Sequence, residues 1–184
     1  ACHTPGQTIS VGSTTGQYKV AGSELGMITS TGLSFGGANC GSQTIAGIDN
    51  ADSNGIGEIF SVLANRENAT VTFGTTSSTF SSVVVLADSG IVVQADVTTT
   101  GGSMYFDGDY DDTNVGDGPN TINFSSGRTL RAATLMTLES TSSYVKAFGT
   151  LSLEAGAGLV LLNDVKSEFF NDPVVINADY DSAG

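Results

Sequence analysis

The feature that most constrains the fold is a stretch of sequence that occurs twice. The first copy begins at Gly90 with GIVVQADV, and the second begins 68 positions later at Gly158 with GLVLLNDV. The match resumes in two Asp-Tyr-Asp triplets, at Asp109 and at Asp179, which are 70 positions apart, so two residues are inserted between. A fixed internal period of about 70 residues is typical of a repeat architecture, in which each unit stacks on the one before.

Around the two copies, the chain consists of short runs that are typical of strands. These runs are rich in Val, Ile, Leu, Phe and Thr, and turns of Gly, Ser and Thr separate them. No long segment has a helical apolar period, and the nearest candidate, Glu58 to Arg66, is short. The recurrence of strand-like runs without helices between them predicts an all-β protein. The runs are 8–11, 18–20, 43–48, 56–63, 69–73, 82–86, 120–124, 134–138, 150–153 and 159–162.

The all-β alternatives are a sandwich, a barrel and a solenoid. Sandwiches built from hairpins usually carry two-residue Asn-Gly or Asp-Gly turns between paired strands. Here Asp107-Gly108 stands in a strand-like context, whereas Asp117-Gly118 lies within a loop. Together with the repeat, this pattern favours a parallel β-solenoid, whose coils contact only their neighbours. Its expected core contains Val83, Val85, Leu86, Ile91, Val93, Leu135, Leu138, Leu151, Leu153, Leu159 and Leu161.

The run Glu24-Leu-Gly-Met-Ile-Thr-Ser-Thr-Gly-Leu-Ser-Phe-Gly-Gly, with the repeated unit, resembles the repeats of filamentous-haemagglutinin-type surface proteins. Those families carry Gly-x-Leu-x-Leu and Ala-Asp-x-x-Thr-x-Gly-Gly rungs and Asp-rich turns. The resemblance covers about residues 24–184 and implies a right-handed parallel β-helix in an exported fibre or adhesin. Residues 1–23 depart from the pattern and are expected to form an N-terminal cap or subunit-joining segment. Residues 24–184 are expected to be β-solenoid repeats within a longer repetitive chain.

The charge balance excludes two classes of partner. Six basic residues against 19 acidic ones give a net charge of −13. Nucleic acid and anionic membrane surfaces are poor partners, because both are bound through clusters of Lys and Arg that this chain lacks. The sequence also contains no apolar run near 20 residues long, so no transmembrane helix is predicted.

The two cysteines bear on the compartment. Cys2 and Cys40 allow one intramolecular disulfide, and the polar, Ser/Thr-rich composition suits an extracellular or cell-surface location. Two unrelated thiols are the alternative. The pair lacks the Cys-x-x-Cys spacing that is typical of zinc sites. The single histidine, His3, has no recognisable catalytic partners and is expected to be a surface residue.

Acidic turns are the candidate metal sites. Asp107, Asp109 and Asp111 stand at alternate positions, and Asn177, Asp179 and Asp181 repeat the spacing. A looser third case is formed by Asp49, Asp52 and Asn54. Carboxylates at alternate loop positions can converge on Ca²⁺, although the Gly and Glu of an EF-hand loop are missing here. The alternative is a solvated acidic turn that keeps the stacked coils soluble. No other cofactor is predicted.

For function, we expect an extracellular structural protein, a subunit or segment of a surface filament with an adhesive role, and not an enzyme. The alternative is a glycan-binding or glycan-cleaving β-helix module, since paired carboxylates can act as acid and base on a glycosidic bond. Trp is absent, and Lys and Arg are too few to bind an acidic sugar well. Acidic turns that recur with a repeat also differ from an active site, which is normally made once.

Two further expectations concern modification and assembly. Asn68-Ala-Thr70 and Asn123-Phe-Ser125 match the acceptor pattern for N-glycosylation. The terminal coils of a parallel solenoid leave backbone groups unpaired, and such edges either carry a cap or pair with another chain. The expected partner is therefore the protein itself, through head-to-tail assembly or continuous repeats, with surface glycans as a second candidate.

Overall fold

The protein is mostly β-structure, as the sequence predicts. The computed structural model describes the chain except for residues 1, 13–15, 116–117 and 182–184. Strands account for 50% of the chain and helices for 5%, which confirms the all-β class. The two helices described, α1 (Gly22–Leu25) and α2 (Asn50–Ser53), are one turn each. The segment Glu58 to Arg66, the nearest to a helical pattern, lies largely in strand β5 (Ile56–Ala64).

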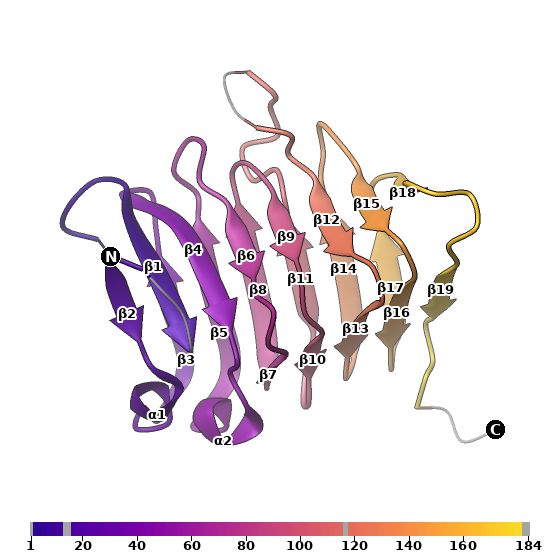
Figure 1. Ribbon diagram of the computed structural model, residues 1–184. Helices are drawn as coiled ribbons and strands as arrows, with labels where there is room; N and C mark the ends of the chain where they lie inside the picture. Colours follow the sequence, from indigo (N-terminus) through magenta and orange to yellow (C-terminus); the bar gives the residue numbers. More distant parts are fainter. Residues whose placement is uncertain (1, 13–15, 116–117, 182–184) are drawn as a thin grey trace.

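The strands form three sheets in which every described pair is parallel (Figure 1). Sheet A has the order β18-β15-β12-β9-β6-β4-β1-β2, sheet B the order β17-β14-β11-β8-β5-β3, and sheet C the order β19-β16-β13-β10-β7. In sheet A these are β18 (Val165–Ser167), β15 (Val145–Phe148), β12 (Ile122–Ser125), β9 (Ile91–Val93), β6 (Val71–Phe73), β4 (Cys40–Ala46), β1 (Gln7–Gly12) and β2 (Tyr18–Val20). In sheet B they are β17 (Gly158–Leu161), β14 (Leu135–Glu139), β11 (Met104–Asp107), β8 (Ser82–Ala87), β5 (Ile56–Ala64) and β3 (Ser30–Gly36). In sheet C they are β19 (Val174–Asn177), β16 (Leu151–Ala155), β13 (Arg128–Ala132), β10 (Val97–Thr99) and β7 (Ser78–Phe80).

From β6 onward, the chain visits the sheets in the fixed order A, C, B and then returns to A. We call one such passage a round. In the first two rounds, α1 and α2 take the place of the sheet C strand, and α2 contacts both α1 and β7. The side chain of Asp49 caps α2 by accepting hydrogen bonds from the N–H groups of Ala51 and Asp52, at 2.7 and 3.0 Å. Successive rounds are hydrogen-bonded to one another along the stack.

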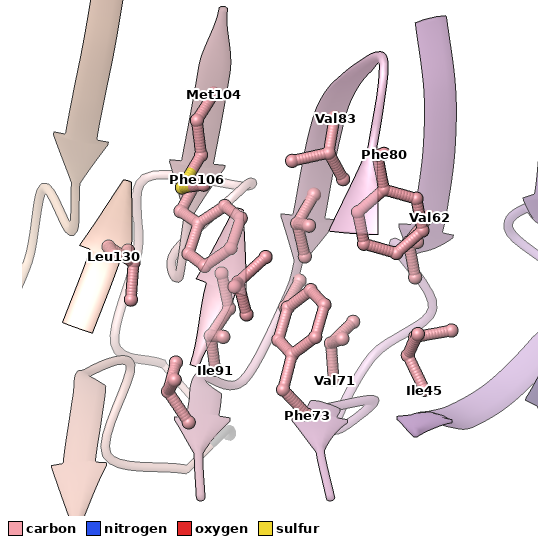
Figure 2. Close-up of a cluster of buried hydrophobic side chains, with 14 of the residues drawn as sticks. Ile45, Val62, Val71, Phe73, Phe80, Val83, Ile91, Met104, Phe106 and Leu130 are labelled. Atoms are coloured by element: carbon pink, nitrogen blue, oxygen red, sulfur yellow. The ribbon is translucent and has the colours of Figure 1, made fainter. Parts of the chain in front are cut away.

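The core lies between the three sheets and runs the length of the stack. Alternate residues of each strand point inward, and Figure 2 shows how these side chains meet. Aromatic rings lie in contact within this column: the ring centroids of Phe73 and Phe106 are 5.2 Å apart, and those of Phe60 and Phe80 are 4.9 Å apart. Each fully buried Val, Leu, Ile or Phe contributes about 1.5–3 kcal/mol, so stability is distributed along the stack. The labelled core residues are Ile45, Val62, Val71, Phe73, Phe80, Val83, Ile91, Met104, Phe106 and Leu130.

The predicted core is correct at most positions and wrong at two. Leu86 and Leu135 point away from the core, and Leu135 is 41% exposed. The reason is the two-residue period of a strand: the buried neighbours of Leu86 are Val85 and Ala87, and Met136 is buried beside Leu135. The predicted core residues that are fully buried are Val83, Val85, Ile91, Val93, Leu138, Leu151 and Leu153. Leu159 and Leu161 pack against the core and are partly exposed.

The 68-residue sequence repeat does not correspond to a whole number of rounds. It relates β8 to β16 and β9 to β17, so each strand is matched to a strand of a different sheet. The sequence similarity therefore reflects similar strands and turns, and not equivalent positions in the stack. Gly90 and Gly158 both have positive φ angles, +112° and +147°, at the turn into the matched strands, a backbone geometry that glycine adopts readily.

The N-terminal strand is inserted out of sequence order. In sheet A, β1 lies between β2 and β4 and pairs in parallel with both, whereas in sheet B the strands β3 and β5 pair directly. A disulfide joins Cys2, just before β1, to Cys40 at the start of β4, as predicted from the two cysteines. The backbone N–H of Cys2 also donates to the sulfur of Cys40 at 3.1 Å. The inserted strand is thus fastened covalently to the body of the stack.

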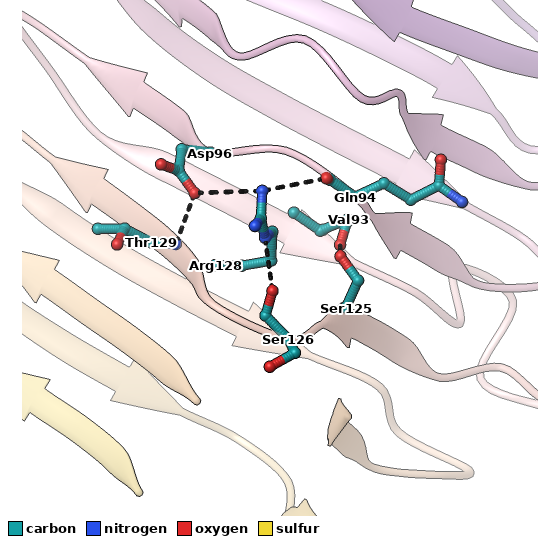
Figure 3. A network of polar contacts seen from close by, with 7 residues as sticks. All are labelled: Val93, Gln94, Asp96, Ser125, Ser126, Arg128 and Thr129. Carbon is teal, nitrogen blue, oxygen red and sulfur yellow. Dashed lines mark hydrogen bonds and ion pairs between the residues drawn. The ribbon is translucent and has the colours of Figure 1, made fainter. Parts of the chain in front are cut away.

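Polar contacts fix the corner between sheets A and C (Figure 3). The guanidinium of Arg128 donates from Nη1 to the carbonyl of Gln94 at 3.2 Å and from Nε to the carbonyl of Ser126 at 3.1 Å. Asp96 accepts a hydrogen bond from the backbone N–H of Thr129 at 2.9 Å and lies 3.9 Å from the guanidinium. These contacts join the corner after β9 to the corner after β12, so they hold two successive rounds in register.

Candidate functional site

The acidic turn predicted from the sequence lies on the longest connection between sheets B and A. Residues 108–121 join β11 to β12, whereas residues 88–90 join β8 to β9 and residues 162–164 join β17 to β18. The described parts of this connection project from the upper edge of the stack in Figure 1. Long loops at one edge of a regular scaffold are where binding residues usually stand. This corner is therefore the first place to test the predicted ligand sets.

Asp109 is the centre of a buried hydrogen-bond network at this corner. Its side chain is fully buried. One carboxylate oxygen, Oδ1, accepts from the side-chain amide of Asn120 at 2.9 Å, and Oδ2 accepts from the backbone N–H of Ser142. Ser142 belongs to the following corner, between β14 and β15. Asp109 therefore ties the long connection to the next round, and both carboxylate oxygens are used as acceptors within the protein.

Asn120 completes this network from the other end of the connection. Its backbone has a φ of +50°, and its amide donates to the carbonyl of Thr113 at 2.5 Å and to the hydroxyl of Ser142 at 3.2 Å. Ser140 is fully buried and donates to the backbone carbonyl of Asn120. Buried polar groups that are hydrogen-bonded in this way give a corner a single conformation. The arrangement is a structural clamp on the loop.

The outer surface of sheet B beside this corner carries a second cluster. Because Met104 and Phe106 point inward, Tyr105 and Asp107 lie on the opposite face of β11, and Asp107 is in register with Glu139 on β14. The phenol of Tyr105 donates to Oε2 of Glu139. Burial raises the pKa of Tyr105, and the hydrogen bond to Glu139 adds to the effect. Two carboxyl groups and a phenol are thus neighbours on one face.

Asp107 has a perturbed carboxyl group. The pKa of Asp107 is raised to about 6: burial is the largest cause and the negative charges of Glu139, Asp112 and Asp109 add to it, against the lowering effect of the hydrogen bond from the backbone N–H of Asp109. That hydrogen bond to Oδ1 is 3.0 Å long. Chemically, Asp107 could donate a proton at mildly acidic pH while Glu139 accepts hydrogen bonds.

The predicted calcium ligands are not gathered into one group. Asp107 and Asp109 have the separate partners described above, and exposed Asp111 accepts from the backbone N–H of Thr113 at 3.1 Å. In the later turn, Asn177 accepts from the backbone N–H of Asp179 at 3.3 Å. Across the described ranges, no group of three or more His, Cys, Asp or Glu side chains is arranged to hold a metal ion.

The remaining calcium candidates also have other roles or positions. Asp49 and Asp52 form the capping box of α2, in which the side chain of Asp52 accepts from the backbone N–H of Asp49 at 3.2 Å. Asn177, Asp179 and Asp181 are exposed at and after the end of β19, with the backbone N–H of Tyr180 bonded to the carbonyl of Ala155 at 3.2 Å. Calcium binding at these turns stays a prediction that only a binding measurement tests.

The two glycosylation candidates differ in accessibility. Asn68 is exposed in the connection between β5 and β6, where its φ is +64° and its backbone N–H donates to Asp88 at 2.7 Å. Asn123 lies within β12, is half-buried, and donates from its amide to the hydroxyl of Thr121 at 2.6 Å. Only Asn68 of these two presents its side chain from a loop. His3 is exposed, as expected.

Two hollows in the surface of the described chain lie at the N-terminal end of the stack, beside β2 and β3. One has a volume of about 280 Å³ and the other of about 420 Å³. Tyr18 and Phe35 line both of them. The larger hollow is lined by Tyr18, Lys19, Val20, Glu24, Ile28, Leu33 and Phe35. The acidic corner, at β11 and β12, lines neither.

Sequence reasoning identified Asp107 and Asp109 but missed their partners. Glu139 lies 32 positions beyond Asp107, although the next step along sheet B, from Met136 to Leu159, spans only 23. The unequal lengths of the rounds hide such pairs in the sequence. Asn120 could have been singled out from the sequence, because Asn is among the few residues other than Gly that tolerate a positive φ at the end of a loop.

Comparison of the chain with protein-family models, with curated proteins and with solved structures found no match. Among the residues that the structure places, no helix has the length and apolarity needed to cross a membrane. The resemblance to filamentous-haemagglutinin-type repeats therefore stays an expectation from the sequence, and function is argued from the chain's own geometry.

Proposed function

We propose that the chain is an extracellular structural element, a segment or subunit of a surface fibre with an adhesive role, built as a right-handed parallel β-helix. The observation that carries this proposal is the fixed order in which the chain visits three parallel sheets, round after round. A body of this kind grows along one axis, and each round depends only on its neighbours. Right-handedness is the expected hand, because crossovers between parallel strands of one sheet are right-handed in nearly all proteins.

Two properties favour a location outside the cell. The disulfide between Cys2 and Cys40 suits an oxidising compartment. The net charge of −13 keeps an elongated β-rich body soluble and discourages lateral association between its exposed sheet faces. Exposed carboxylates such as Asp111 and Asp112 on the long connection contribute to this charge.

The second candidate function is a glycan-binding or glycan-cleaving module. The observation that favours it is the register of Asp107 with Glu139 on the outer face of sheet B, with Tyr105 bonded to Glu139. A glycan array and a reducing-sugar assay on polysaccharides separate the two functions. Turnover that Glu139→Gln abolishes would establish the enzyme, and binding without turnover would support an adhesive fibre.

The direct test of the fibre role is its place on the cell. Antibodies raised against the folded chain should label extended surface structures of intact source cells in immunogold electron microscopy. Labelling confined to the cytoplasm of permeabilised cells would contradict the proposal. A denaturing gel under reducing conditions gives the covalent length of the labelled polypeptide, which separates a repetitive fibre chain from an assembled subunit.

A further inference from the structure

Strand β1 has a place in the stack unlike that of the other described strands. The first round runs from β2 through α1 to β3, and the second runs from β4 through α2 to β5. These two rounds touch directly on two sides, since β3 pairs with β5 and α1 contacts α2. In sheet A they are separated, because β1 lies between β2 and β4 (Figure 1). β1 is therefore an extra strand wedged into one side of the stack.

The register of the three strands allows β2 to take the place of β1 beside β4. Lys19 on β2 and Thr44 on β4 both pair with Ser10 of β1, and Val20 and Ile45 share a partner on β1 in the same way. If β1 left, β2 would need to move by one strand spacing, about 4.8 Å, to pair with β4. Because the register would be unchanged, no side chain would change face. Sheet A would then have the same order as sheet B.

Two local features weaken the docking of β1. Neighbouring parallel strands are usually joined by a crossover of about a dozen or more residues, but only residues 13–17 join β1 to β2. The hydroxyl of Ser10 is buried and has no hydrogen-bond partner among the described residues, which is unfavourable for a polar group. A Cβ atom at Gly16 would lie 2.9 Å from this hydroxyl, so the connection to β2 lies against β1. Burial of Ile9 and Val11 favours docking, so the two tendencies oppose each other.

The disulfide that fastens β1 is accessible from one side. Cys2 precedes β1, and Cys40 is the first residue of β4. Cys40 is fully buried, whereas Cys2 is partly exposed and lines the smaller hollow, of about 280 Å³. A small thiol can therefore approach the sulfur of Cys2. The backbone N–H of Cys2 donates to the sulfur of Cys40 at 3.1 Å, a contact that stabilises negative charge on Cys40 when the S–S bond breaks.

We propose that the disulfide between Cys2 and Cys40 is a redox latch, which holds β1 between β2 and β4 when oxidised and lets β1 leave when reduced, so that β2 pairs with β4. The reductant is a thiol. Its thiolate attacks the Sγ atom of Cys2, the S–S bond breaks, and Cys40 leaves as a thiolate that takes a proton from solvent. A second thiolate attacks the mixed disulfide, which releases Cys2 as a thiol and converts the reductant to its own disulfide.

The latch goes beyond the proposed fibre role and does not rest on it. Thiols are kept reduced in the cytosol, whereas disulfides form and persist in oxidising compartments. The unlatched form therefore belongs to reducing surroundings, and the latch closes where the disulfide forms. In the unlatched form, residues 2–12 become accessible chain, and the first two rounds touch on all three sides.

Hydrogen exchange followed by mass spectrometry tests the release of β1. After reduction of the folded chain with dithiothreitol, residues 7–12 should exchange about tenfold faster or more, while residues 40–46 stay protected because β2 replaces β1. Cys2→Ser/Cys40→Ser should match the reduced chain, and alkylation counts the free thiols. Unchanged protection of β1 in the reduced chain, or equal loss in β1 and β4, would overturn the proposal. A disulfide that resists the reductant in the folded chain would overturn it too.

An engineered disulfide tests the pairing of β2 with β4. Lys19 and Thr44 lie two strand spacings apart, roughly 10 Å, which is beyond the Cα separation of about 7 Å that a disulfide spans. In the Cys2→Ser/Cys40→Ser background, Lys19→Cys/Thr44→Cys should form a disulfide within the monomer on mild oxidation, because β1 has left. The matched control in the same background is Thr44→Cys/Val92→Cys, a pair that β6 separates, and its thiols should stay free. Free thiols in the first pair, or equal disulfide formation in both pairs, would refute the latch.

Discussion

Asp109 offers the sharpest test of what holds the acidic corner together. Its two carboxylate oxygens accept from the side-chain amide of Asn120 and from the backbone N–H of Ser142. Asp109→Asn keeps the shape of the side chain but replaces one acceptor oxygen by an amide donor. In either amide orientation, one buried N–H group then faces another donor. The expected loss of stability is about 1–3 kcal/mol, the usual cost of an unsatisfied buried polar group.

For a chain of this size, that loss corresponds to a fall in melting temperature of about 2–12 °C. The matched control is Asp111→Asn, because Asp111 is exposed and its change should stay within about 0.5 kcal/mol. Thermal unfolding followed by circular dichroism, in chelator and in millimolar Ca²⁺, measures both variants. Equal losses for Asp109→Asn in the two buffers support the hydrogen-bond clamp. An unchanged melting temperature in chelator would refute it, and a Ca²⁺-dependent rise that this variant abolishes would establish the predicted metal site.

Three further changes test other parts of the account. Leu153→Asp should cost several kcal/mol and disrupt stacking, measured by urea unfolding, because Leu153 is fully buried and the new carboxylate has no partner. Cys2→Ser/Cys40→Ser should lower the free energy of unfolding by about 2–4 kcal/mol while the circular dichroism spectrum stays β-rich, since the disulfide closes a long loop; an unchanged stability would show that β1 needs no covalent fastening. Because the pKa of Asp107 is raised to about 6 when folded, the folded chain holds this proton more tightly, and stability should fall as pH rises from about 4 to 7. Asp107→Asn should remove that fall, and parallel pH profiles of the two proteins would contradict the assignment.

Sequence reasoning recovers the local features of the fold. The strand-like runs correspond to strands, and the two-residue period correctly places Val83 and Val85 inward. The same rule excludes Leu86 from the core, because it follows Val85 directly on one strand. Hydrophobicity alone places Leu86 in the core, which is wrong. A run of several apolar residues therefore indicates a strand reliably, but only the alternation within it tells which side chains are buried.

Long-range relations were not predictable, because they depend on the lengths of the corners. The step along sheet B is 21 positions from Val83 to Met104 but 32 from Met104 to Met136, where residues 108–121 intervene. Because of this long step, the partners of Asp107 and Asp109 on the next round cannot be located from the sequence. The insertion of β1 between β2 and β4 likewise has no local signal, since it depends on pairing with two strands that both come later in the chain.

Cryo-electron microscopy of native material that contains this chain tests the central claim, the fibre role, most directly. The account predicts strands perpendicular to the fibre axis, stacked at about 4.8 Å along it, with a right-handed path through three sheet faces. It also predicts that buried apolar side chains, such as Leu153 on β16, fill the interior of each round. Strands that run along the fibre axis, a left-handed path, or isolated compact particles in place of fibres would contradict the account.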